Sequence, residues 1–542
     1  MTSFRKYIYS LLAIVLVIGI LPTSISAYEK YNDEKEVKIG LKFKESAVPS
    51  VSLSSNAGIE IGENIEGQFN SIMRFTSKGK LIIRKDDCFS NNTDSLSEGA
   101  IHIQIGDEFN TKDEANVFLE NIPKLKSNPY VVYENGWSVW VGLYESVFEA
   151  ESEINSMKSI LSTYELKIIY KDDKRIQVVD ETGKVSFIYN TKDKVYEYKG
   201  ISRNDNDGII SVDGKKYRGK IIAKRFTDSD LTIINKLKLQ EYLYGVLPRE
   251  ISGNWPIEAQ KAQAVAARNY AMVSIGNHDE HGFDLCGTTH CQVYGGYDSE
   301  NPRSIQAVDE TNGKVLTCNG KIVTTFYHSN SGGYTENAEN VWSSPLDYIK
   351  GVEDPYSIGA PNDRWEKVYS RQEIEGILAS KELYVGSLEN LIIKERSQSG
   401  RVLKMEIVGT SGSEILEKNK IRSIFGYNNI KSTLFDINGG NDTMQNILGD
   451  IDQPYTKNNI ANGYVINDEE VKKINNTEKQ YIYDGTNYTN TNVGNSSSNY
   501  TFVGKGWGHG LGMSQWGAKK MAEEGFTYEE ILKHYYTDTI IE

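Results

Sequence analysis

The pattern of hydrophobic and polar positions alternates between strand-like and helix-like stretches along the chain. Period-2 alternation predicts strands in residues 37–43 and again in residues 48–62, and we place these in a β-rich segment covering residues 28–95. Residues 175–240 are strand-rich as well. Because the sequence contains no βαβ phosphate-binding motif, the pattern predicts a mixed, multi-domain α+β fold without a doubly wound parallel sheet.

Residues 96–172 repeat a pattern of strand, glycine and helix. IHIQIG predicts a strand that ends at Gly106, and residues 111–120 then place their apolar side chains at helical spacing. WSVWVGLY predicts a strand through Gly142, which is followed by an amphipathic helix over residues 147–160. This duplication predicts a compact βαββαβ module in which two helices cover one face of a sheet.

A carboxylate lies shortly before the start of another predicted helix. Residues 257–272 predict an alanine-rich helix that begins after Pro256. Glu250 precedes this helix, and we expect its carboxylate near the positive end of the helix dipole, which stabilises the charged form. A general acid needs the opposite, a raised pKa, which an apolar enclosure would supply. The aromatic residues available for such an enclosure are Tyr242, Tyr244 and Trp255.

Composition narrows the class of partner. The chain has 542 residues, of which 39% are hydrophobic, and this is enough apolar material for several buried cores. Its formal net charge is -14 and its basic residues are scattered, so nucleic acid is disfavoured as a partner. A neutral or locally cationic polymer such as a glycan remains compatible with this charge.

The N-terminus has the order of features that an export signal needs. Arg5 and Lys6 precede an apolar run over residues 8–21, and small residues ending in Ser26-Ala27 follow it. We therefore predict a signal peptide over residues 1–27 and an exported protein, extracellular or associated with the cell wall. The alternative is an uncleaved segment that anchors the protein in the membrane.

Three sequence blocks carry a family resemblance. They are LYGVLPREI with the following EAQKAQAVAARNYA, then FYHSNSGGYTE at 326–336, then GKGWGHGLGMSQWGA at 504–518. In this order they resemble the signature of the SpoIID/LytB family. The resemblance implies a SpoIID-type catalytic domain over residues 173–542, interrupted by an Asn-rich excursion at 435–500. In the same way, WSVWVGLYES and the repeat around it resemble the SPOR domain, a module that binds peptidoglycan glycan strands lacking stem peptides.

The resemblance implies an activity and two catalytic residues. Sporulation members of the family are peptidoglycan lytic transglycosylases, and their catalytic glutamate falls on Glu250. One carboxylate suffices, because the acetamido oxygen of N-acetylmuramic acid can stabilise the anomeric centre and its C6 hydroxyl can replace water, leaving a 1,6-anhydro end. The arginine of the helix motif falls on Arg268, for which we expect a positioning or electrostatic role; a structural salt bridge is the alternative. LytB-type members are described as amidase enhancers, so a non-catalytic glycan-binding protein that assists a cell-wall amidase is the alternative function.

The other two blocks supply candidate substrate-binding residues. The C-terminal block places glycines at alternate positions, which allows close backbone approach to a sugar chain. Within it, His509 and Gln515 can offer hydrogen bonds. Ser329 and Ser331 precede a glycine pair in a polar turn of the kind that lines clefts. We therefore predict that these four residues contact the glycan.

A loop rich in cysteine and histidine predicts a metal site. Thiolate and imidazole ligands suit tetrahedral Zn²⁺, and similar C-x-x-x-H-C-Q-x-Y loops occur in zinc-binding SpoIID proteins. Four protein ligands leave no open position, so we expect a structural metal. The alternatives are a disulfide of Cys286 with Cys291 or Cys318 and, if one ligand is a water, a metallohydrolase. The predicted ligands are His281, Cys286, His290 and Cys291, with His278 as the alternate histidine.

Overall fold

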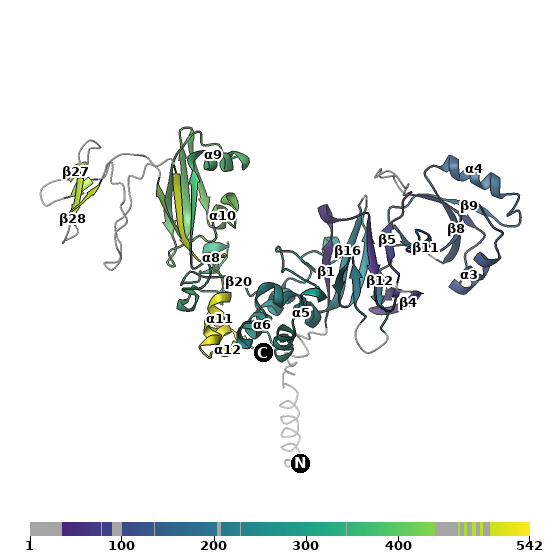
Figure 1. The fold of residues 1–542 in the computed structure, drawn as a ribbon, viewed down its shortest axis with the longest axis horizontal. Coiled ribbons are helices and arrows are strands. Elements are labelled where there is room, and N and C mark those ends of the chain that lie inside the picture. The colour runs from purple at the N-terminus through teal and green to yellow at the C-terminus, as the bar shows by residue number, and fades with distance from the viewer. Residues whose placement is uncertain are drawn as a thin grey trace, which may run out of the picture. The chain divides into compact units, whose positions relative to one another are not determined.

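A computed structural model of the chain places its described residues in two compact units (Figure 1). Unit 1 comprises Met1–Gly253, Ala267–Val315 and Glu542, and unit 2 comprises Asn254–Ala266 and Leu316–Ile541. The predicted signal peptide lies outside the described residues, and among those that are described no helix is long and apolar enough to cross a membrane. The described residues are 35–76, 79–88, 100–134, 136–202, 208–227, 229–342, 344–439 and 499–542, with four short strands between 464 and 491.

Unit 1 contains a seven-stranded sheet in the order β17-β1-β16-β15-β12-β3-β4. Neighbouring strands are antiparallel except β1 and β17, which pair in parallel. The predicted strands at 37–43 and 48–62 are confirmed by β1, β2 and β3. The sheet positions the candidate site, because β16 runs directly into α5. The bounds are β1 Glu36–Lys42, β3 Ile59–Ile65, β4 Gln68–Phe75, β12 Tyr196–Gly200, β15 Lys220–Arg225, β16 Leu231–Lys238 and β17 Leu285–Cys286.

The predicted βαββαβ order is confirmed within unit 1. Its elements are β6 Ile101–Ile105, α3 Lys112–Asn121, β7 Tyr130–Tyr133, β8 Trp137–Tyr144, α4 Val147–Met157 and β9 Leu166–Ile169. The two helices pack on one face of the strands over a shared apolar core. The sheet does not end with this module, however, because β7 pairs with β11 and the sheet continues to ten strands. The predicted compact module is therefore part of a larger sheet, and its likeness to a SPOR domain stays a prediction.

The remaining strands of this ten-stranded sheet flank the module. The full order is β14-β13-β2-β5-β10-β11-β7-β8-β6-β9. Pairing between β2, β5, β10 and β11 is antiparallel throughout, whereas β11 and β7 run in parallel. The bounds of the flanking strands are β2 Ser50–Ser54, β5 Leu81–Lys85, β10 Arg175–Val179, β11 Val185–Asn190, β13 Ile210–Val212 and β14 Lys215–Tyr217.

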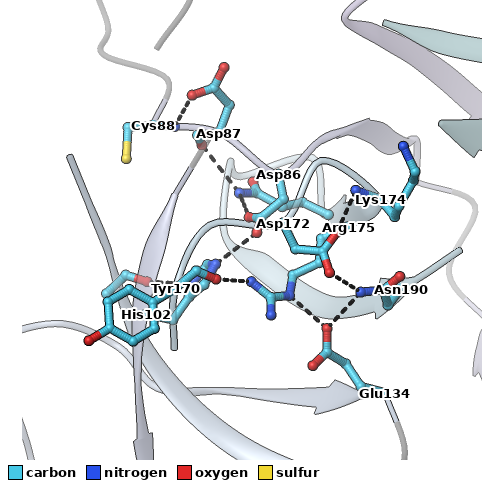
Figure 2. Close-up of polar contacts among 12 residues, drawn as sticks. Asp86, Asp87, Cys88, His102, Glu134, Tyr170, Asp172, Lys174, Arg175 and Asn190 are labelled. Atoms are coloured by element: carbon cyan, nitrogen blue, oxygen red, sulfur yellow. Dashed lines mark hydrogen bonds and ion pairs between the residues drawn. The ribbon is translucent and has the colours of Figure 1, made fainter. Parts of the chain in front are cut away.

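A buried polar network links distant strands of this sheet (Figure 2). His102 on β6 contacts Asp86, which follows β5, through Nε2 and Oδ2 at 2.8 Å, although four strands lie between β5 and β6 in the sheet order. The other ring nitrogen, Nδ1, lies 2.8 Å from the hydroxyl of Tyr130 and 3.1 Å from the carbonyl oxygen of Gly142. The Tyr130 hydroxyl itself donates to that carbonyl oxygen, so both ring nitrogens of His102 face acceptors. We conclude that the hydrogen bonds of His102 tie the end of β5 to β6 and β7, strands that are not neighbours of β5 in the sheet order.

The first of two hydrophobic cores in unit 2 lies around two three-stranded sheets. Strand β30 lies between β21 and β25, and β23 lies between β22 and β24. β25 and β30 pair antiparallel and bracket residues 440–498, so the predicted Asn-rich excursion leaves and re-enters the same sheet. Most of that excursion lies outside the described residues. The bounds are β21 Arg364–Ser370, α9 Arg371–Ser380, β22 Leu388–Arg396, β23 Val402–Gly409, β24 Gly412–Glu417, α10 Asn419–Phe425, β25 Phe435–Gly439 and β30 Asn499–Lys505; the short strands in the excursion are β26 Tyr464–Ile466, β27 Val471–Lys473, β28 Gln480–Tyr483 and β29 Tyr488–Thr491.

A second core of unit 2 forms around the first half of α6. Ala262, Val265 and Ala266 of this helix are fully buried against the C-terminal helices, and their small side chains allow close packing. The predicted helix over residues 257–272 is thus confirmed. The bounds are α6 Ile257–Val273, β18 Leu316–Cys318, β19 Lys321–Ile322, β20 Tyr327–His328, α8 Ala338–Val341, β31 Met513–Ser514, α11 Gln515–Glu523, α12 Tyr528–Tyr535 and β32 Ile540–Ile541.

Candidate functional site

Glu250 is the last residue of α5, Leu239–Glu250. This helix forms because apolar residues recur at helical spacing, from Leu239 through Leu243 to Val246 and Leu247, and all of these are buried. The expectation that Glu250 lies near the positive end of the following helix stays a prediction. Within unit 1, Glu250 lies at the carboxyl end of its own helix, which is the negative end of that helix's dipole and works against a charged carboxylate.

Two tyrosines of unit 1 lie within electrostatic range of Glu250. Burial raises the pKa of Tyr242 well above its usual value, and the charges of Cys291 and Glu250 raise it further. Burial also raises the pKa of Tyr270, again with contributions from Cys291 and Glu250. Of the aromatic residues predicted to enclose Glu250, Tyr242 thus lies in range, whereas the hydroxyl of Tyr244 donates to Asp309 Oδ1 at 2.5 Å. The half-buried carboxylate and its two tyrosine neighbours form the first part of the candidate site.

Arg268 is completely buried on α6. Its Nη1 donates to the carbonyl oxygen of Lys314 at 3.2 Å, and its Nη2 donates to that of Val308 at 3.3 Å, in helix α7, Pro302–Glu310. These bonds hold α6 against the end of α7. The catalytic role that the sequence resemblance implies for Arg268 stays a prediction, while its structural role is visible in these two contacts.

In unit 2 the structure brings the second and third sequence blocks together. β20 and β31 pair in parallel, with His328 opposite Ser514, and Asn330 forms a bridge with Trp507. The backbone N–H of Trp516 donates to the carbonyl oxygen of Ser329 at 3.0 Å. The four predicted glycan-contacting residues therefore lie on paired segments, although residues 337–503 separate the two blocks in the sequence.

Ser331 lies in the interior of unit 2 rather than on a surface turn. It is fully buried, and its Oγ donates to Asp354 Oδ2 at 2.6 Å. The other oxygen of Asp354, Oδ1, accepts a hydrogen bond from the hydroxyl of Tyr535 at 2.9 Å. Asp354 thus ties the serine loop to α12, and sequence reasoning missed it because an isolated aspartate carries no motif. Glycan contact by Ser331 stays a prediction, which its burial restricts to an indirect effect.

His509 is held as a neutral imidazole. Burial and the nearby charges of Arg422 and Arg401 lower its pKa to about 3. Its Nδ1 accepts a hydrogen bond from the backbone N–H of Leu511 at 3.0 Å. Its ring lies 5.6 Å from that of His328, whose Nδ1 donates to the carbonyl oxygen of Leu511 at 3.0 Å. The ring also hydrogen-bonds the backbone of Tyr327, so contact of the half-buried His509 with a sugar stays a prediction.

Four side chains of unit 1 form a candidate metal centre. Ligand atoms of His278, Cys286, His290 and Cys291 all lie within 4.8 Å of one another. Cys291 Sγ lies 3.4 Å from His278 Nε2 and 3.5 Å from His290 Nδ1, while Cys286 Sγ lies 3.8 Å from His290 Nδ1. Of the predicted ligands, Cys286, His290 and Cys291 lie in this cluster, and the alternate histidine, His278, lies there with them. His281 lies outside the cluster, with its Nε2 2.9 Å from Glu280 Oε1.

This donor set fits tetrahedral zinc. Two thiols and two imidazoles match a closed structural site, which leaves no position for a catalytic water. All four cysteines of the chain are free thiols in the structure, which does not contain the disulfides considered from the sequence. Burial raises the pKa of Cys291 to about 12, and a bound cation would reverse this preference for the thiol. The four residues that would hold the metal are therefore His278, Cys286, His290 and Cys291.

Two family models match separate parts of the chain. A model described as Stage II sporulation protein matches residues 227–318, which include Glu250, Arg268 and the metal cluster. A second model, described as Domain of unknown function (DUF8618), matches residues 346–450, which include much of the sheet core of unit 2.

Relatives extend the match over more of the chain. An uncharacterized protein of Brachyspira hyodysenteriae is 31% identical over 339 residues, covering 62% of this chain and 75% of the relative. The amidase enhancer of Bacillus subtilis is 32% identical over 336 residues, covering 61% of this chain but 45% of the relative. Stage II sporulation protein D of the same organism is 26% identical over 326 residues, covering 57% of this chain and 75% of the relative. This chain belongs to the SpoIID/LytB family.

Proposed function

We propose that this protein acts on the bacterial cell wall as a peptidoglycan lytic transglycosylase, with Glu250 as its general acid and base. The observation that carries the proposal is the position of Glu250. It is a half-buried carboxylate at the carboxyl end of a rigidly packed helix, with Tyr242 and Tyr270 in electrostatic range. The negative end of the helix dipole works against a charged carboxylate, which is the direction that a general acid requires.

The chemistry needs a single carboxylate. Glu250 donates its proton to the glycosidic oxygen as the bond from N-acetylmuramic acid to the next sugar breaks. The C6 hydroxyl of the same muramic acid attacks the anomeric carbon and gives its proton to the Glu250 carboxylate, so a 1,6-anhydro end forms and the glutamic acid is restored. Proton transfer of this kind contributes roughly 10²–10⁴-fold in rate.

The other groups have supporting roles in this proposal. The paired segments that carry Ser329, His509 and Gln515 offer hydrogen-bonding groups to the glycan. The Cys/His cluster holds a structural zinc ion, which when bound crosslinks the loop at residues 278–291. The family relatives support a protein of the cell envelope, in agreement with the predicted export signal.

The test is product analysis with purified mature protein. Wild type is incubated with intact peptidoglycan and with amidase-treated peptidoglycan, and the soluble products are analysed by mass. We expect 1,6-anhydro products from wild type and none from Glu250→Gln. Glu120→Gln, which changes an exposed carboxylate of the same unit, is the matched control and should cleave like wild type. Cleavage by Glu250→Gln at the wild-type rate would exclude Glu250 as the catalyst.

A second candidate function rests on the relative named amidase enhancer, which is 32% identical to this chain. In that case the protein binds glycan and stimulates a cell-wall amidase without cutting. The same samples decide between the two functions. Equal glycan binding by wild type and Glu250→Gln, no anhydro product from either, and faster release of stem peptides by an added amidase would establish the enhancer.

A further inference from the structure

The residues that follow the metal ligand Cys291 pack directly against the helix that ends in Glu250. The ring of Tyr294 lies so close to Gly245 of α5 that a Cβ added at Gly245 would come within 2.5 Å of a ring atom. The next residue, Gly295, donates its backbone N–H to the carbonyl oxygen of Gly245 at 2.9 Å. The metal loop and α5 are therefore in backbone contact within unit 1, and Gly245 lies five residues before Glu250.

Gln292 adds a second connection. It is 2% exposed, and its two amide atoms reach two different helices. Its Oε1 accepts a hydrogen bond from the hydroxyl of Tyr242 on α5 at 3.3 Å. Its Nε2 donates to the carbonyl oxygen of Ala267 on α6 at 3.3 Å. A side chain adjacent to a metal ligand thus bridges the two helices that carry the candidate catalytic glutamate and arginine.

Tyr294 completes the connection to the sheet. Its ring centroid lies 5.2 Å from that of Tyr242, and its hydroxyl donates to Asn235 Oδ1 on β16 at 2.9 Å. Asn235 donates in turn to the carbonyl oxygens of Arg218 and Lys220 at 2.9 and 3.0 Å. Because β16 runs into α5, Tyr294 holds the start of the helix through the sheet and its middle through Gly245.

From these contacts we propose that Gln292 and Tyr294 are positioning residues, which couple the metal-bound state of the Cys/His loop to the placement of Glu250. The proposal rests on the function proposed above. With zinc bound, the loop is crosslinked at Cys291, and Gln292 and Tyr294 are held against Tyr242 and Gly245. Without the metal, Cys291 no longer fixes the loop that carries these two side chains. The backbone hydrogen bonds of α5 then open more often. The zinc ion thereby acts on the reaction at a distance, through this chain's own side chains, while remaining structural.

The coupling is measured by hydrogen exchange of the full chain, with and without a zinc chelator. In wild type, chelation should speed amide exchange in the peptide that covers α5. In Gln292→Leu, which removes both hydrogen bonds at similar volume, zinc content should stay at the wild-type value while the response of α5 to chelation falls by about half. Unchanged exchange of α5 on chelation of wild type would overturn the proposal, as would a wild-type response in Gln292→Leu.

A kinetic measurement distinguishes positioning from mere stabilisation. With amidase-treated peptidoglycan, Gln292→Leu should lower kcat about tenfold and leave KM unchanged, because substrate contacts remain while the carboxylate is misplaced. A general loss of fold would instead reduce the active fraction and leave kcat per active molecule unchanged. Gln292→Glu, which keeps an acceptor for Tyr242, should recover part of kcat. If wild type cuts no glycan, the proposed function fails while the exchange experiment still decides the coupling.

A more conservative variant tests the same connection in case Gln292→Leu misfolds. Tyr242→Phe removes the single hydroxyl that bonds Gln292 and keeps the ring in the core. It should weaken the response of α5 to chelation in the same direction as Gln292→Leu. Tyr244→Phe is the matched control, because its hydroxyl on the same helix bonds Asp309 rather than the metal loop. If both tyrosine variants respond equally, the Gln292 connection plays no part in the coupling.

Discussion

The two units use their motif residues in opposite ways. In unit 1 the reactive groups lie at the end of an element or in a loop: Glu250 at the last position of α5, Cys286 at the last position of β17, and His290 and Cys291 in the loop that follows β17. In unit 2 the comparable polar residue, Ser331, is fully buried and bonded to Asp354. A polar residue in a glycine-rich motif can therefore stabilise the conformation of its own loop, while the reactive groups lie in other segments of the chain.

The same contrast applies to charge. Unit 1 gathers thiols and imidazoles that a cation would bind together. Unit 2 gathers the cations Arg401 and Arg422 around His509 and keeps that imidazole neutral. The first arrangement has the donor set for a metal ion, whereas the second is sensitive to pH. Four experiments break or sharpen this comparison.

The largest effect is expected at Glu250. Glu250→Gln should lower the rate of glycan cleavage by roughly 10²–10⁴-fold, because it removes proton transfer. Its free energy of unfolding should stay within about 0.5 kcal/mol of the wild-type value. The rate is measured by release of anhydro ends and the stability by urea titration. A large fall in stability with little change in rate would place Glu250 among the structural residues and remove the contrast between the units.

Zinc removal should mainly affect unit 1. Chelation should destabilise the chain by about 4 kcal/mol at a metal concentration near a thousand times Kd, since the bound metal stabilises only the folded loop. The check is thermal unfolding with and without chelator, together with the metal content of Cys291→Ser. His278→Ala should lose metal, whereas His281→Ala should retain it. Equal loss in both histidine variants would show that the cluster rearranges on binding.

Acidification should destabilise unit 2 through His509. The unfolded histidine titrates near pH 6.5 and the folded one has a pKa of about 3, so the unfolded chain binds more protons between these values. The stability contributed by the neutral imidazole is therefore present at neutral pH and falls by about 3 kcal/mol by about pH 4. Urea midpoints across this range measure it. His509→Gln should flatten the dependence; His534→Gln should not, and an equally steep curve in His509→Gln would assign the titration to another group.

The smallest effect is expected at Ser331. Ser331→Ala removes the hydrogen bond to Asp354 and should cost about 1–2 kcal/mol of folding stability. Binding of glycan per folded molecule should not change, because the hydroxyl is buried. A pull-down on amidase-treated peptidoglycan, corrected for the folded fraction, measures the binding. Loss of binding without loss of stability would instead support a direct contact of Ser331 with the glycan.

The sequence pattern predicted an element correctly where the spacing of apolar residues within that element alone indicated a helix or a strand. The βαββαβ order of residues 96–172 and the helix α6 followed from apolar spacing, and both are confirmed. The helix α5 was missed, although Leu239, Leu243 and Val246 have helical spacing, because Pro248 and the strand before it obscured the pattern. The extension of the module into ten strands required pairing between β7 and β11, which are distant in sequence and leave no local mark.

By itself the sequence determined the family and the set of reactive side chains. Blocks such as GKGWGHGLGMSQWGA and the Cys/His loop are contiguous, so they can be recognised without the tertiary structure. Only the tertiary structure decided which of these groups meet. It gathered His278 rather than His281 with the two cysteines, placed Glu250 at the carboxyl end of α5, and buried Ser331 against Asp354. The physical reason is that metal geometry, dipole direction and burial are properties of spatial neighbours, and neighbours such as Asp354 and Tyr535 are set by long-range packing rather than by position along the chain.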